Sequence, residues 1–82
     1  ASKSGVMRLT EALAEETKAD RSLTVNAVLP SIIDTPQNRA DMPDADPKTW
    51  VAPKDLAEGI LFLSSEQAHA MTGALVPVTG RV

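Results

Sequence analysis

Two short runs rich in aliphatic and β-branched residues, at positions 23–29 and 74–79, most constrain what this chain can fold into. The first run does not alternate between polar and apolar residues, which is typical of a strand buried on both faces of a parallel sheet. Asn26 is its polar exception and needs hydrogen-bond partners. A strand, a long crossover containing a helix and a second strand form a βαβ unit with parallel strands. Pro77 cannot donate to a β-ladder, so the second strand is predicted at the sheet edge.

Two helical patterns accompany these strands. Residues 2–20 predict a helix, because apolar residues recur every three to four positions and alanine, leucine and glutamate favour helix. The residues expected to be buried on it are Val6, Leu9, Ala12 and Leu13. A second helix is expected from Pro53, which suits the first helical position, to about Ser64. Its expected buried residues are Leu56, Ala57, Ile60 and Leu63. The predicted fold class is therefore α/β.

Length and composition exclude several classes of function. The 82 residues are enough for one small domain, and 43% hydrophobic content is ordinary for a globular protein. A net charge of −3, with acids and bases interspersed, argues against nucleic acid as a partner. No apolar run approaches the ~20 residues that cross a bilayer. Without cysteine the chain has neither disulfides nor thiolate metal sites.

The chain begins at Ala1, not at methionine, inside a helical pattern already in progress. We therefore expect an internal piece of a longer protein; the alternative is a chain whose leader has been removed. The sequence shows no signal-peptide pattern, which favours a cytoplasmic location.

Residues 30–52 show neither a helical nor a strand period, and four prolines and four aspartates interrupt them. A loop this long inside a compact chain is usually functional or disordered. The stretch 29–36 spans the carboxyl end of the first predicted strand, and ligands bind just beyond such ends in open α/β sheets. Trp50 is expected to pin the loop by packing, with contact to a substrate as the alternative.

The reactive side chains form no complete catalytic constellation. His69 is the only possible base for a serine nucleophile, and its polar surroundings in the sequence predict a surface histidine. One histidine and scattered loop aspartates make no metal-ligand set, so no metal site is predicted. The four glycines are too dispersed for a phosphate-binding loop. Asp34 and Asp41 could meet across the loop, although solvated acids are the simpler expectation.

Five short motifs follow one another along the chain: Ala1-Ser2-Lys3-Ser4-Gly5, Asn26-Ala27-Val28-Leu29-Pro30, Thr35, Thr72-Gly73 and Val76-Pro77-Val78-Thr79-Gly80. This ordered set resembles the C-terminal third of a short-chain dehydrogenase/reductase. The loop motifs resemble more closely the quinonoid dihydropteridine reductases and their bacterial relatives; they are Ile33-Asp34-Thr35-Pro36, Asn38-Arg39, Met42-Pro43, Ala45-Asp46 and Trp50. The resemblance implies a partial Rossmann-type, doubly wound parallel sheet. Residues 1–82 would supply its last two strands and two helices, without the N-terminal dinucleotide-binding part.

The resemblance implies a catalytic and cofactor-binding role for Lys3. The family's Tyr-x-x-x-Lys motif places its lysine at Lys3, and its tyrosine would fall one position before Ala1. In the family the tyrosine is the general acid/base, while the lysine holds the nicotinamide ribose and lowers the tyrosine pKa. Without the resemblance, a lysine near a helix start is usually a solvated surface group.

The same resemblance implies cofactor contacts just after the first strand. Pro30 and Thr35 match the family pattern Pro-Gly-x-x-x-Thr, and Ser31 replaces the usual glycine. Backbone groups near Ile33 would bind the nicotinamide carboxamide, and Thr35 would contact the carboxamide or the phosphates. The implied cofactor-binding residues are Lys3, Pro30, Ser31, Ile32, Ile33 and Thr35. For the two isoleucines, simple packing is an equal alternative.

The implied activity of the complete enzyme is NAD(P)-dependent hydride transfer to or from a carbonyl, imine or quinonoid small-molecule substrate. The glycine-rich loop, the ribose-reading acid, the catalytic serine and the tyrosine lie upstream in this family. We therefore expect the isolated chain to be inactive and to bind no cofactor. One alternative is a self-associating module, because two strands and two helices leave apolar surface uncovered, and family members commonly form homo-oligomers. Another is a remnant that binds nucleotide without chemistry.

Overall fold

The computed structural model describes residues 2–82 and has an α/β fold built on two strands. The elements in chain order are α1 (Lys3–Thr17), β1 (Ala27–Pro30), α2 (Pro36–Asp41), the 3-10 helix η1 (Pro47–Thr49), α3 (Pro53–Leu63), the 3-10 helix η2 (Glu66–Ala68) and β2 (Leu75–Val78). β1 and β2 pair in parallel, which confirms the predicted βαβ unit. The first helix is three residues shorter than predicted at its carboxyl end, because the Asp20 carboxylate accepts hydrogen bonds from Ser22 and favours a turn.

The register of the sheet explains how both strands accommodate a proline. Pro30 lies opposite Val78, and Pro77 lies opposite Leu29. Ala27 donates its N–H to the carbonyl of Ala74 at 3.0 Å. In a parallel pair only alternate residues bond to a given neighbour, so both proline nitrogens point away from the partner strand. The first strand was predicted to end before Pro30, and this prediction is wrong. The prediction that Pro77 lies in an edge strand is confirmed.

β1 begins at Ala27, four residues later than predicted, because Asn26 pairs through its side chain. Its Nδ2 donates to the carbonyl of Met71 at 2.9 Å, and its Oδ1 accepts the N–H of Ala74 at 3.0 Å. The polar residue predicted to need partners thus joins the entry of β1 to the entry of β2.

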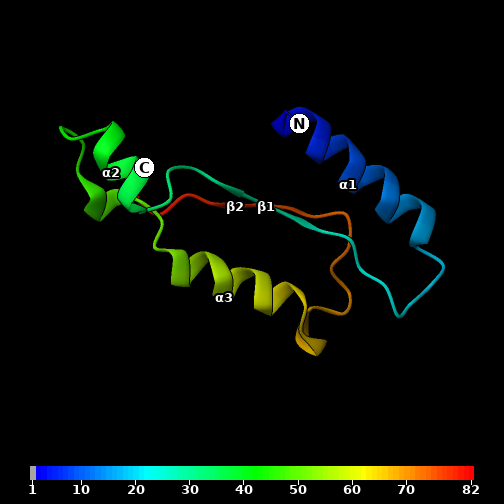
Figure 1. Cartoon of the computed structure of the whole chain (residues 1–82). Coiled ribbons are helices and arrows are strands. Elements are labelled where there is room, and N and C mark those ends of the chain that lie inside the picture. Colours follow the sequence, from blue (N-terminus) through cyan, green and yellow to red (C-terminus); the bar gives the residue numbers. More distant parts are fainter. Residues whose placement is uncertain (1) are drawn as a thin grey trace.

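Helices α1 and α3 lie on opposite sides of the two-stranded sheet (Figure 1). The face of α1 that is buried carries small side chains, Thr10 and Ala14. A Cβ added to Gly73 would lie 3.4 Å from that of Ala14, so helix and chain approach closely there. On the other side, Gly59 of α3 comes near Val78 of β2, where an added Cβ would lie 3.9 Å from Cγ2.

The predicted buried stripes on the two helices are only partly covered. Exposed fractions are 41% for Val6, 59% for Leu9, 39% for Leu13 and 48% for Ile60. A sheet of two strands is too narrow to cover the large side chains of both helices. The Cα radius of gyration is 14.9 Å, against about 12 Å expected for a compact chain of this length. The prediction that apolar surface remains uncovered is confirmed.

Residues 30–52 contain two short helices, so the prediction of a structureless loop is wrong. Thr35 caps α2 and Asp46 caps η1, each through a side-chain oxygen that accepts a backbone N–H. A proline follows each cap at the first helical position, where its missing N–H is not needed. These helices are too short to show an apolar period, but their Thr-Pro and Asp-Pro pairs are recognisable start signals.

Candidate functional site

The loop formed by residues 34–50 begins and ends at the carboxyl end of β1. The N–H of Asp34 donates to the carbonyl of Val51 at 2.8 Å, and the N–H of Val51 donates to the carbonyl of Ile32 at 2.9 Å. These bonds form a parallel bridge between Ile33 and Val51. Val51 is only 2% exposed, so the bridge includes one of the most buried side chains of the small core. The bridge holds both ends of the loop together.

Ser31 extends the junction between the strands. Its Oγ donates to the carbonyl of Thr79 at 3.0 Å, which ties the residue after β1 to the residue after β2. Among residues 2–82, only glycines have positive φ, so Ser31 occupies the glycine position of the family pattern without a left-handed backbone. Pro30 and Ser31 are both half-buried at this junction.

Ile33 and Thr35 are held by one residue that sequence reasoning gave no role of its own, Asn38. The side-chain Nδ2 of Asn38 donates to the carbonyl of Ile33 at 2.8 Å. Its backbone N–H donates to Oγ1 of Thr35 at 3.1 Å. Within residues 2–82 the N–H of Ile33 makes no hydrogen bond, and the Thr35 hydroxyl has a proton left to donate. The signal in the sequence is the spacing Thr-Pro-x-Asn, which puts an amide side chain three residues after a capping threonine.

Asp34 forms a bidentate ion pair with Arg39. The two distances are 2.6 Å from Nε to Oδ1 and 2.9 Å from Nη2 to Oδ2. The hydrogen bond from Arg39 lowers the pKa of Asp34 below its ordinary value of 3.8, and the same bond raises the pKa of Arg39. Asp41 instead accepts a bond from Gln37 at 2.9 Å. The two acids that could meet across the loop, Asp34 and Asp41, thus each pair with a residue of α2 instead.

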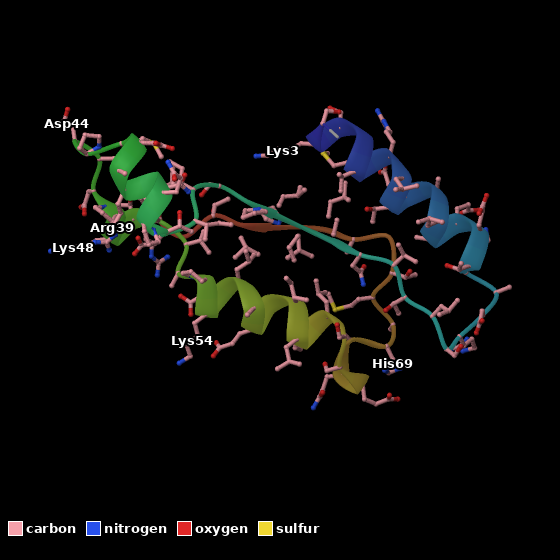
Figure 2. The ribbon with its side chains drawn as sticks, in the orientation of Figure 1. Lys3, Arg39, Asp44, Lys48, Lys54 and His69 are labelled. Carbon is pink, nitrogen blue, oxygen red and sulfur yellow. The ribbon has the colours of Figure 1, made fainter. Side chains whose placement is uncertain are left out.

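Lys3 is the first residue of α1 and is exposed. Figure 2 shows its side chain leaving the helix toward the side of the molecule that carries α2 and Arg39. No ion pair or hydrogen bond joins Lys3 to the other residues that the structure describes. The structure thus brings Pro30, Ser31, Ile32, Ile33 and Thr35 together and leaves Lys3 apart from them.

Trp50 is buried in the fold, and His69 lies on the surface. Trp50 is 7% exposed, which fits the predicted role of pinning the loop by packing. His69 is exposed, with Nδ1 3.0 Å from the carbonyl of Glu66, and lies at the opposite end of the molecule from Arg39 (Figure 2).

In the described chain, no three metal-binding side chains gather, and every helix is too short or too polar to cross a membrane.

A groove of about 340 Å³ lies away from this junction, between β1 and α3. Its lining residues are Thr24, Asn26, Val28, Ile60, Leu63 and Ser64. It follows the face of the sheet that α3 covers incompletely.

Comparison with known proteins places these features in one family. A family model described as Enoyl-(Acyl carrier protein) reductase matches residues 1–80. The chain is 37% identical over 89 residues to the 3-oxoacyl-acyl-carrier-protein reductase FabG of Pseudomonas aeruginosa, covering 98% of this chain and 35% of that one. The chain belongs to the short-chain dehydrogenase/reductase family. It spans about a third of the length of the curated relatives it matches.

Solved structures of dehydrogenases share the fold of this chain. A short-chain type dehydrogenase/reductase from Mycobacterium ulcerans superposes with a TM-score of 0.83 at 27% identity, over 96% of this chain and 32% of that chain. A 4-hydroxyisoleucine dehydrogenase complexed with NADH superposes with a TM-score of 0.71 at 28% identity, over 90% of this chain and 33% of that chain. The predicted Rossmann-type α/β class is confirmed.

Proposed function

We propose that the junction after β1 forms the nicotinamide side of an NAD(P)-dependent oxidoreductase site. The observation that carries this proposal is the pair of unused donors at Ile33 and Thr35. Among residues 2–82 the N–H of Ile33 has no partner while its carbonyl accepts from Asn38, and the Thr35 hydroxyl keeps its proton. An amide group such as the nicotinamide carboxamide needs both donors and acceptors in fixed positions.

The residues present fit such a cofactor at one end only. Ile32, Ile33 and Ser31 are half-buried, so they offer a partly apolar surface with backbone polar groups for a flat ring. The bound dinucleotide would supply hydride chemistry, and this chain would orient its nicotinamide end. The glycines are dispersed and form no loop that could hold the pyrophosphate.

Lys3 is proposed to hold the nicotinamide ribose and to lower the pKa of a neighbouring general acid. The 82 residues contain no tyrosine, so the proton donor implied by the family must come from other residues. We therefore propose that these residues act as the C-terminal segment of a dehydrogenase domain and that the chain alone has no activity and binds no cofactor.

The substrate is proposed to be a small molecule with a carbonyl, imine or quinonoid group beneath loop 34–50. The two relatives named above act on different substrates, an oxoacyl group and an amino acid, so their names do not fix this one. The quinonoid dihydropteridine reductase subgroup stays a prediction based on the loop residues, and a cytoplasmic location stays a prediction as well.

The experiment that tests this function joins residues 1–82 to the N-terminal part of the Pseudomonas reductase, in place of its matched segment. We expect the chimera to bind NADH or NADPH, and the isolated chain to show no turnover with either. Turnover by the isolated chain would refute the claim that it is inactive. A folded chimera that binds neither cofactor would refute the proposed site.

Uncovered apolar side chains favour self-association as a second property. Leu61 is 71% exposed and Phe62 49% exposed on α3, and Leu9 is 59% exposed on α1. Leu61 and Phe62 are neighbours on α3, and large apolar side chains exposed together are typical of interaction sites. Sedimentation of the purified chain tests this: dimers or larger species are expected, and a stable monomer at high concentration would argue against it.

A further inference from the structure

The residues after β2 lie directly against the returning end of loop 34–50. The N–H of Arg81 donates to the carbonyl of Thr49 at 2.9 Å. A Cβ built on Gly80 would lie 2.7 Å from that same carbonyl oxygen and 3.0 Å from the carbonyl carbon of Trp50. Both contacts are with backbone atoms that cannot rotate away. This close approach therefore requires glycine at position 80.

Gly80 lies in a tight turn that places it against loop 34–50. Its φ is +63°, and the N–H of Val82 donates to the carbonyl of Thr79 at 3.2 Å. A four-residue turn with positive φ at its second position is of the kind that glycine dominates. The same Thr79 carbonyl accepts the Ser31 hydroxyl at 3.0 Å, so the turn is fixed to the end of β1.

The contacts continue from this turn to the proposed site. Thr49 and Trp50 precede Val51, and Val51 forms the parallel bridge with Ile33. Trp50 and Val51 are 7% and 2% exposed, so the returning end of the loop is its best-packed part. Val51 is hydrogen-bonded to Ile32 and to Asp34, the residues on either side of Ile33. A shift of the Thr49–Trp50 peptide would therefore displace Val51.

We propose that residues 79–81 position loop 34–50, with Gly80 as the positioning residue. The turn holds the returning end of the loop against the sheet. Removing or distorting the turn is expected to expose Trp50 and to weaken the Ile33–Val51 bridge. This claim goes beyond the proposed function, because it holds for the chain whatever the site binds.

The test uses Trp50, the single tryptophan of the chain, as its own reporter. One variant stops after Thr79 and removes Gly80, Arg81 and Val82, which are all exposed, so no clash is introduced. A second variant is Gly80→Ala. Both are expected to shift Trp50 emission to longer wavelength and to increase its quenching by acrylamide, while far-UV circular dichroism shows that the helices remain.

The matched control is Gly73→Ala. Gly73 also has a positive φ, +75°, and its added Cβ would be 3.4 Å from Ala14, but it lies at the other end of β2. It is expected to lower stability through the same backbone strain and to leave Trp50 emission in the folded chain unchanged. If both position-80 variants fold and keep Trp50 as protected as in the unmodified chain, the proposal is wrong.

Hydrogen exchange in the unmodified chain gives a test that needs no variant to fold. The amides of Arg81, Val51 and Asp34 are expected to open together, with protection that agrees within about fivefold, the factor that corresponds to ~1 kcal/mol. An unprotected Arg81 amide beside strongly protected Val51 and Asp34 amides would overturn the proposal.

Discussion

Asn38 donates a side-chain hydrogen bond of 2.8 Å to the carbonyl of Ile33, five residues earlier in the chain. The same residue gives its backbone N–H to Thr35. One half-buried amide thereby fixes the two residues that the family resemblance assigns to the nicotinamide. The geometry of the junction depends on this pair of residues. The Ile33 N–H keeps a fixed direction only if the peptide groups of Ile33 are held in place.

We predict that Asn38→Asp impairs cofactor binding in the chimera. The carboxylate cannot donate to the Ile33 carbonyl, and leaving this part-buried acceptor unpaired costs about 1 kcal/mol. The expected result is a higher Kd of the chimera for NADH or NADPH. Gln37→Ala is the control, since Gln37 is exposed and bonds only Asp41. An unchanged cofactor Kd in a folded Asn38→Asp chimera would contradict the role.

The Asp34–Arg39 pair predicts a dependence of stability on pH. Because the folded-state pKa of Asp34 is lowered, its contribution is fully present above the ordinary pKa of 3.8 and is lost as pH falls through the lower folded value. Urea unfolding of the chain and of Asp34→Asn should therefore differ most above about pH 5 and converge at lower pH. Arg39 is exposed and Asp34 is only half-buried, so the difference should be small and should shrink in high salt. A difference that grows as pH falls would show that the sign is wrong.

Asn26 should matter more for stability than its position before a strand suggests. It donates to Met71 and accepts from Ala74, so Asn26→Ala leaves two backbone groups without partners. Met71 is exposed, so water can replace the bond to its carbonyl, and we expect a loss of about 1 kcal/mol in the free energy of unfolding, measured with urea. Gln67→Ala is the control, because Gln67 is exposed on η2 and a surface change there should stay within about 0.5 kcal/mol. Equal effects of both substitutions would contradict this account.

The sequence predicted the parts of the fold that depend on regular patterns. β-branched runs indicated both strands, and Pro53 indicated the start of α3. It did not predict which helical side chains are buried, because burial depends on how much sheet lies beneath them. Val6 and Leu9 follow the helical period but extend beyond a sheet of two strands, whereas the small Thr10 and Ala14 make the contact.

Sequence motifs located the candidate site at the end of β1, its cofactor-binding role stays a prediction, and some of its supporting contacts were not foreseen. Pro30, Ser31 and Thr35 were assigned by a motif, and the structure brings them together at the end of β1. The spacing Thr-Pro-x-Asn is a local signal for the role of Asn38, whereas the role of Gly80 depends on a contact that no local pattern reveals. Asn38 acts through a carbonyl five residues earlier, and Gly80 acts through a peptide about 30 residues away in the chain.

The amide resonance of Ile33 tests the central claim most directly. In a chimera labelled with ¹⁵N-isoleucine, NADH or NADPH should shift the Ile33 amide proton, because the carboxamide accepts a bond from that N–H. Adenosine monophosphate, which lacks the nicotinamide half, should leave it unchanged. An Ile33 amide that does not move while the chimera is saturated with dinucleotide would contradict the proposed site.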